Sequence, residues 1–396
     1  MKCFATIAAV AAITVPGAAW AEAKRPPTIY WISVATGEGS IQGMPGMGGM
    51  MAGLMGGGMP GADERTLTLQ LASPDTPTGA PRAAHAIPAG LRMGEALPLL
   101  SPEHQRAVHT PDRDDDTSTT MEKPRGRISV YWGCGATVRS GQPKVYDLTK
   151  MPPAEFGKAF MGRANRQRPP SASTARSYGE WPNRDSQIKV PAGASLIGDH
   201  QVSGNYTPDI RFAIGAPQDF MAPVRLRKQG DTAGAVHLSW AQIPTAIGQF
   251  TSVMASRGED DMVIWSSAEI QEPGWALHDY LPSADVEKWV KDGLLMAPNT
   301  TTCTIPAGIF KEAGGAMLRF TAYGRELNTG WPEKPKDPVW GVKVRLKTTG
   351  MLMLDGPDME HGATAAKAQP DRTDNPLDTV NAIIETGGAL KGLFGR

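Results

Sequence analysis

Six methionines in a glycine-rich stretch are the first residues whose chemistry stands out. The stretch spans residues 43–61, without a His or a Cys. Thioethers are soft ligands that suit Cu(I) in an oxidising compartment, although glycine entropy makes closure around a metal unfavourable. Two interpretations stay open, a Cu(I) site and a loop without metal whose side chains touch a partner or the domain surface. The methionines are Met44, Met47, Met50, Met51, Met55 and Met59.

Tryptophans in turn-like contexts form a second group of candidates. Aromatic rings exposed on a β-sandwich can stack on sugar rings. Trp132 and Trp240 follow the inward phase of their strands, so we expect both in the core. The tryptophans flanked by Pro or Gly are candidates for glycan or partner binding, and they are Trp181, Trp275, Trp331 and Trp340.

Three basic residues alternate with apolar ones near the end of the chain. Lys343, Arg345 and Lys347 fall on one face of the strand that this alternation predicts. Such a face suits an anionic glycan or a lipid head group. A solvated strand face accounts for the same pattern, and both interpretations stay open.

Two cysteines follow the amino-terminal segment that contains Cys3. Cys134 and Cys303 form an isolated pair, which in an oxidising compartment favours a disulfide. They lie far apart in the sequence, in segments that we assign to different domains, and this favours two separate buried thiols. The sequence leaves both possibilities open.

The sequence contains no complete catalytic or metal-binding motif of a familiar kind. Asp112, Asp114 and Asp116 alternate like the start of a calcium loop, but Thr117 replaces the glycine of the turn and Lys123 replaces the bidentate glutamate. We interpret this stretch as a solvated acidic loop. Because no nucleophile, zinc-protease or phosphate-loop signature is present, we predict no catalytic residue and no enzyme activity.

The first 21 residues have the pattern of a secretory signal peptide. Lys2 precedes an apolar run over residues 4–15, and Ala19 and Ala21 place small residues at a cleavage point. We expect cleavage after Ala21 and a periplasmic or secreted mature protein. No later run reaches the roughly 18 to 20 apolar residues of a membrane helix, so we expect no transmembrane segment.

Composition limits both partners and fold. Lys and Arg total 40, as do Asp and Glu, so no overall field favours nucleic acid. The 45 Gly and 34 Pro separate short apolar segments, which is typical of all-β proteins. Alternation with a period of two predicts half-buried strands at residues 28–34, 65–71, 128–132, 210–214 and 342–346.

Helix signals are few. Ser283 as N-cap and Gly293 as stop frame a short helix with Val286, Trp289 and Val290 on one side. Residues 375–396 predict an amphipathic C-terminal helix. That helix either packs on its own domain or docks peripherally on a partner or a bilayer surface.

Residues 235–350 carry a family resemblance. The strand VHLSW at 236–240, the strand AIGQF at 246–250 and the later segment at 304–324 resemble parts of a fibronectin type III domain. The resemblance implies an Ig-like β-sandwich, interrupted by an insertion over residues 268–301. Because such domains are mostly spacers and binding modules, it leaves activity open. The whole chain also loosely resembles exported Gram-negative proteins of unknown function, which implies an envelope location.

These observations predict two or three Ig-like or fibronectin-like sandwiches with long low-complexity loops. We expect an exported, non-enzymatic envelope binding or scaffold protein whose partner is an envelope protein or a glycan. The alternatives are periplasmic copper handling through residues 43–61 and a glycan-acting hydrolase with carboxylates from separate loops. The expected segments are the signal peptide 1–21, an N-terminal β domain 22–150, a linker with strands 151–224 that packs on or belongs to that domain, a sandwich 225–355, a linker 356–374 and the helix 375–396.

Overall fold

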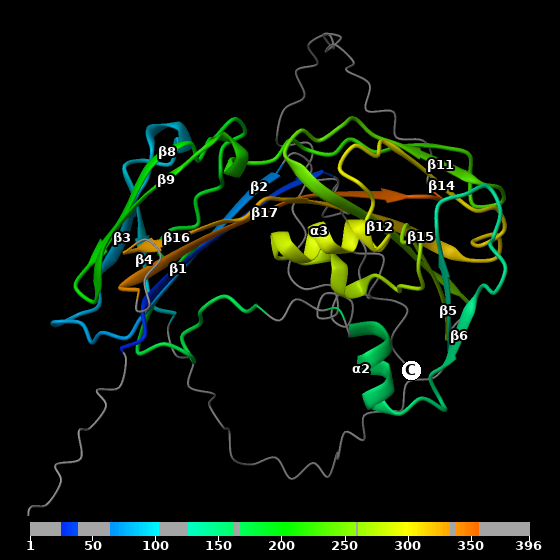
Figure 1. Cartoon of the computed structure of the whole chain (residues 1–396), viewed down its shortest axis with the longest axis horizontal. Coiled ribbons are helices and arrows are strands. Elements are labelled where there is room, and N and C mark those ends of the chain that lie inside the picture. Colours follow the sequence, from blue (N-terminus) through cyan, green and yellow to red (C-terminus); the bar gives the residue numbers. More distant parts are fainter. Residues whose placement is uncertain are drawn as a thin grey trace, which may run out of the picture. The chain divides into compact units, whose positions relative to one another are not determined.

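The computed structural model describes residues 25–38, 64–102, 126–161, 163, 167–258, 260–332 and 338–355. These residues form mostly β-structure, as the sequence predicts, in one large and two smaller sheets (Figure 1). The expectations on residues 1–21, 43–61, 356–374 and 375–396, including the six methionines and the C-terminal helix, lie outside the described residues.

The large sheet has ten strands and mixes parallel with antiparallel pairs. Its order is β6-β5-β13-β12-β15-β17-β1-β2-β7, and β16 also pairs with β17. The pairs β1 with β17 and β5 with β13 are parallel. Its strands are β1 (Thr28–Glu38), β2 (Glu64–Ser73), β5 (Arg127–Trp132), β6 (Lys144–Asp147), β7 (Ser177–Trp181), β12 (Ala246–Arg257), β13 (Asp261–Ser266), β15 (Gly314–Gly324), β16 (Leu327–Trp331) and β17 (Trp340–Met353).

The two smaller sheets are antiparallel. One has the order β4-β3-β8-β9, with β3 (Ala83–Ala86), β4 (Ala96–Leu99), β8 (Gly198–Gly204) and β9 (Thr207–Ile214). The other has the order β10-β11-β14, with β10 (Arg227–Gln229), β11 (Val236–Ser239) and β14 (Thr302–Ile305).

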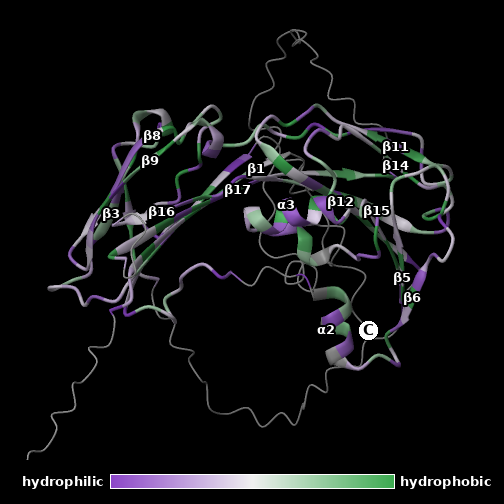
Figure 2. Cartoon of the chain, viewed as in Figure 1, coloured by the Kyte–Doolittle hydropathy of each residue, from purple (hydrophilic) through white to green (hydrophobic). Residues whose placement is uncertain are grey.

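The alternation seen in the sequence sets the core. In β2, Leu67, Leu69 and Leu71 are buried while the residues between them are partly exposed. Apolar side chains from all three sheets join one core cluster, so both smaller sheets pack on the large one. Figure 2 shows hydrophobic residues along the strands of these sheets. We call the side of β1 that carries Tyr30 and Ile32 the inner face, because these side chains belong to that core.

The large sheet crosses the expected segment boundaries. Strands β1, β2, β5 and β6 come from residues 22–150, β7 comes from 151–224, and the remainder come from 225–355. A boundary at 150 or 224 therefore does not separate one sheet from another. Parallel pairing between segments so far apart in sequence leaves no local signal, because the strands carry the same alternation wherever they pair.

Cys134 and Cys303 form a disulfide. It joins the loop after β5 to strand β14 and so connects the large sheet to the three-stranded sheet. The alternative of two separate thiols is wrong, because the two segments that the sequence assigns to different domains lie side by side.

Helices cover parts of the large sheet. The predicted helix is α3 (Ser283–Lys291), which packs Val286, Trp289 and Val290 over β12. The expected N-cap, Ser283, is the first residue of the helix, and Pro282 holds the N-cap position. The Ser283 hydroxyl accepts the backbone N–H of Glu326. A second helix, α2 (Pro153–Met161), is not among the elements that the sequence predicts. Short 3-10 turns are η1 (Ala89–Leu91), η2 (Ala216–Gln218) and η3 (Trp275–His278).

Within the described residues, none of the helices is long and apolar enough to cross a membrane.

Candidate functional site

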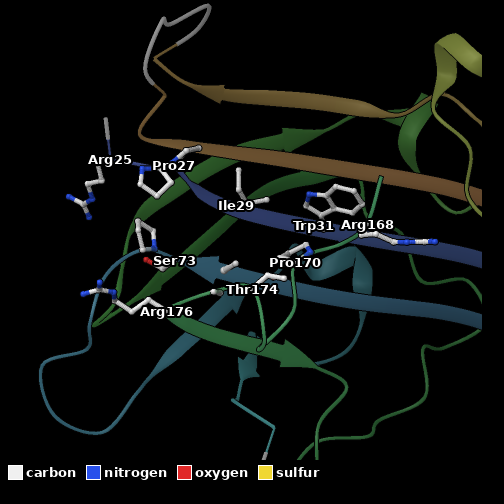
Figure 3. Close-up of a pocket in the computed structure, with 13 residues that line it drawn as sticks. Arg25, Pro27, Ile29, Trp31, Ser73, Arg168, Pro170, Thr174 and Arg176 are labelled. Atoms are coloured by element: carbon white, nitrogen blue, oxygen red, sulfur yellow. The ribbon is translucent and has the colours of Figure 1, made fainter. Parts of the chain in front are cut away.

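An open groove of about 870 Å³ lies on the outer face of β1 and β2. Because successive side chains of a strand point to opposite faces, Ile29 and Trp31 face outward while Tyr30 points into the core. Both outward residues line the groove, together with residues that precede β1 and with the segment 168–176 that crosses the strands (Figure 3). Its volume falls in the range of about 300 to 1,000 Å³ that is typical of ligand sites.

Side-chain hydrogen bonds hold the crossing segment in place. Gln70 of β2 donates from Nε2 to the carbonyl oxygen of Pro170 at 3.3 Å. Thr174 and Ser171 close a tight turn, in which Thr174 Oγ1 accepts the Ser171 N–H at 3.1 Å. This wall of the groove is therefore anchored to the sheet.

Three arginines line the groove, and we call this site the arginine groove: Arg25, Arg168 and Arg176 around Ile29 and Trp31. Arg25 pairs with Asp75. Arg168 and Arg176 are exposed, and in the part of the chain that the structure describes neither has an ion-pair partner. Figure 3 shows Arg168 at the end of the groove where Trp31 lies, and Arg25 and Arg176 at the opposite end. The groove thus offers guanidinium groups to anions at both ends.

The basic face predicted at Lys343, Arg345 and Lys347 adjoins this groove through Trp31. The Arg345 guanidinium lies 5.2 Å from the Trp31 ring centroid and 4.2 Å from that of Tyr280. Lys347 lies 4.6 Å from the Tyr280 ring and donates from Nζ to the carbonyl oxygen of His278 at 2.9 Å. We call Arg345 and Lys347, with Trp31 and Tyr280, the cation layer.

The cation layer is not a solvated strand face, so that interpretation is wrong. The inserted segment around Tyr280 covers it and leaves Lys347 only 9% exposed. Burial, followed by the charges of Arg319 and Arg345, lowers the pKa of Lys347 to about 7. Lys343 is also largely covered and pairs with Glu326 at 3.1 Å. These cations stabilise the contact between the insertion and the sheet, and they are already partnered.

His278 carries the strongest resemblance to a catalytic group. Its Nε2 lies 2.7 Å from Ser252 Oγ, and its Nδ1 lies 2.8 Å from Thr321 Oγ1. Burial and the charges of Arg319 and Lys347 hold its pKa well below the usual value. A base needs its protonated form to be stabilised, and here two cations oppose that form. The three side chains therefore suit a structural contact better than a nucleophilic dyad.

A second polar cluster lies on the inner face of β1. The Tyr30 hydroxyl is 2.8 Å from His85 Nδ1, and His85 Nε2 is 2.9 Å from His200 Nδ1. His200 Nε2 is 2.7 Å from the carbonyl oxygen of Leu196. Because that carbonyl can only accept, His200 carries its proton on Nε2, His85 donates from Nε2, and Tyr30 donates to His85. We call this run of hydrogen bonds, from Tyr30 through His85 and His200, the histidine relay. All of its side-chain polar groups are hydrogen-bonded when both imidazoles are neutral.

The predicted tryptophans do not gather at one site. Trp181 is buried in the core, where its indole Nε1 donates to Ser186 Oγ at 2.9 Å, and Trp340 is buried in the same core cluster. Both were expected in loops, but they lie on strands, on the buried face. Trp331 is 60% exposed, yet it pairs in register with Trp340 and so lies on the inner face. The side chain of Trp275 lies outside the described residues.

Trp31, Arg168 and Arg176 are not among the site residues that the sequence predicts. Trp31 lies within a predicted strand, and both arginines lie in a Pro-rich and Arg-rich segment that composition marks as a linker. The available signal was the arginine-rich composition of that segment. Among the described residues, no group of three or more His, Cys, Asp or Glu side chains is arranged to hold a metal ion.

A search against models of known protein families finds no match, and a search of curated proteins finds none either.

Proposed function

We propose that this chain is an exported, non-enzymatic binding protein of the cell envelope whose ligand site is the arginine groove. The observation that carries the proposal is that, among the described residues, the guanidiniums of Arg168 and Arg176 have no ion-pair partner in a ligand-sized groove beside Trp31. Exposed arginines flanking an apolar surface suit a ligand that bears carboxylates or phosphates.

We also propose that residues 225–355 form a fibronectin type III-like sandwich. The support is the run β13-β12-β15-β17 of the large sheet, which faces the sheet β10-β11-β14 across a shared core. Trp240 and Phe320 meet there with ring centroids 5.0 Å apart. Two antiparallel sheets packed over one core define sandwich architecture. Such a scaffold suits a protein that presents a binding surface.

An extracytoplasmic location fits two features. The first 21 residues have the signal-peptide pattern, and the Cys134–Cys303 disulfide is of the kind that persists in oxidising compartments. Fractionation of cells that express the full chain tests this location. Recovery of uncleaved protein in the cytoplasm would contradict it.

The binding function is tested with anions of different chemistry. The oxidised chain from Glu22 onward is titrated with polyphosphate, polyglutamate and anionic phosphatidylglycerol vesicles, and tryptophan fluorescence reports binding. We expect at least one of these to bind, with at least a tenfold loss of affinity in the triple variant Arg25→Ala, Arg168→Ala, Arg176→Ala. Arg211→Ala, an exposed arginine of β9, is the matched control and leaves affinity unchanged.

Binding should weaken as salt rises, because exposed charges are screened over about 8 Å at physiological ionic strength. If no anion binds the unmodified chain more tightly than it binds the triple variant, the proposed function is wrong.

A further inference from the structure

We propose that the ligand of the arginine groove is an extended acidic peptide segment whose two carboxylates are four residues apart. This inference rests on the proposed function, because it specifies the chemistry of an anion that the same groove binds. It commits to a protein partner in place of the glycan that sequence analysis also allows.

The spacing follows from the strand beneath the groove. A strand rises about 3.3 Å per residue, so Pro27 and Trp31 of the floor are about 13 Å apart. Arg25 and Arg176 lie at the Pro27 end and Arg168 at the Trp31 end (Figure 3). An extended peptide rises by the same amount per residue, so side chains at positions i and i+4 span the same distance on one face.

The middle of the groove is aliphatic. Ile29, Ala72 and Pro170 line it between the two charged ends. Such a surface suits the apolar or prolyl residues that separate the two acidic side chains of a peptide. Burial of that apolar area adds to the affinity that the arginines supply.

The polar inventory of the groove disfavours a sugar. Its neutral hydroxyls belong to Ser73 and Thr174, and both are engaged. Ser73 Oγ accepts the Asp75 N–H at 3.1 Å, and Thr174 Oγ1 donates to the Ser171 carbonyl at 3.1 Å. The hydroxyls of a neutral sugar would therefore find partners only at the arginines, which bind a carboxylate more strongly than a hydroxyl. The Trp31 ring is only 9% exposed and already carries Arg345, so it offers little stacking surface.

The charge distribution also disfavours a single anionic head group. A lipid phosphate engages one end of the groove and leaves Arg168 or Arg176, whichever lies at the opposite end, without a counter-charge among the described residues. A peptide with two separated carboxylates neutralises both ends at once. The geometry thus selects by the distance between charges as well as by their sign.

The test uses fluorescein-labelled heptapeptides and fluorescence anisotropy. The main probe has aspartates at positions 2 and 6 with Ala-Pro-Ala between them. One matched probe has aspartates at positions 2 and 4, and another replaces both aspartates by asparagine. We expect the main probe to bind at least tenfold more tightly than the asparagine probe, and several-fold more tightly than the closely spaced one.

Single alanine variants show which end of the groove binds each carboxylate. Arg168→Ala removes one end of the groove, so we expect about a tenfold loss for the main probe and no remaining preference between the two spacings. Arg176→Ala has a similar effect from the other end, and Arg211→Ala leaves all affinities unchanged. Unfolding midpoints of the variants confirm that each chain remains folded.

Two results overturn this inference and leave the proposed function standing. The first is equal affinity for both aspartate spacings. The second is tighter, groove-dependent binding of polyphosphate or of phosphatidylglycerol vesicles than of the main peptide. Absence of binding by every anion overturns the proposed function itself, so the two failures are distinguishable.

Discussion

The two faces of β1 handle polar groups in opposite ways. Tyr30 on the inner face begins a chain of hydrogen bonds through His85 and His200 that ends at a backbone carbonyl. On the outer face, Trp31 belongs to both the cation layer and the arginine groove. Arg345 of the layer stacks on its ring, whereas Arg168 and Arg176 of the groove have no counter-charge among the described residues. This contrast shows that polar side chains mark a candidate site when they lack partners within the protein. Polar side chains that are already hydrogen-bonded to one another do not.

The histidine relay of Tyr30, His85 and His200 should be the part of the molecule whose stability depends most on acid. Burial lowers the pKa of His85 well below the usual value, with the nearby His200 as a second cause, and burial lowers that of His200. Near pH 6.5 the two imidazoles therefore become protonated in the unfolded protein but stay neutral in the folded protein. The free energy of unfolding falls as pH drops through that value. The pair contributes up to about 2.7 kcal/mol per pH unit.

Urea unfolding between pH 7.5 and 4.5 measures this slope against the double variant His85→Leu, His200→Leu. The control His237→Gln changes an exposed histidine and should retain the full slope. If the double variant does not fold, ring resonances of the unmodified protein provide the measurement, because neither imidazole should titrate near pH 6.5. If both rings titrate near pH 6.5, the histidine relay is open to solvent and this prediction is wrong.

The cation layer should give the next largest effect. Arg345→Ala removes a guanidinium that stacks on Trp31 and Tyr280 and donates from Nε to Ser33 Oγ at 2.7 Å. We expect a loss of about 2 kcal/mol in the free energy of unfolding, measured in urea at pH 7. Arg345→Met keeps much of the packing and should lose less. A loss below about 0.5 kcal/mol would place Arg345 with the groove arginines and remove the contrast between the two groups.

Lys347 makes the same contrast visible through pH. Its pKa is lowered to about 7 by burial, while the unfolded lysine titrates near 10.4. Between these values the unfolded chain binds the extra proton, so stability rises with pH by up to about 1.4 kcal/mol per unit. The difference in unfolding free energy between the unmodified protein and Lys347→Met, measured from pH 7 to 10, should follow this slope. A difference that stays constant over that range would mean that the amine is solvated.

Local pattern predicted much of the fold and little of the site. The alternation of Leu67, Leu69 and Leu71 located β2, and the apolar face of Val286, Trp289 and Val290 located α3, because these patterns depend only on neighbours in sequence. The parallel pairing of β1 with β17 could not be predicted, since it joins strands more than 300 residues apart and any strand with the same alternation fits as well.

The site depends on that non-local pairing. Register places Trp31 opposite Lys343 and Ser33 opposite Arg345, so a basic strand that looked solvated became a covered layer. Likewise, Arg168 and Arg176 become site residues only because their segment crosses β1 and β2 and lines the groove. A sequence shows which side chains can carry charge, but the partners that neutralise them come from segments that only the fold brings together.

The smallest stability effect belongs to the arginine groove, and it is the sharpest test of the comparison. Arg168 and Arg176 are exposed and form no ion pair within the described residues, so Arg168→Ala and Arg176→Ala should each change the free energy of unfolding by less than about 0.5 kcal/mol. The same changes should weaken binding of the diaspartate probe about tenfold, whereas Arg345→Met should destabilise the protein with little effect on that probe. Opposite responses of stability and binding in the two groups of cations would separate residues that maintain the fold from residues that receive a ligand. A large loss of stability in Arg168→Ala would instead assign the groove to the structural set.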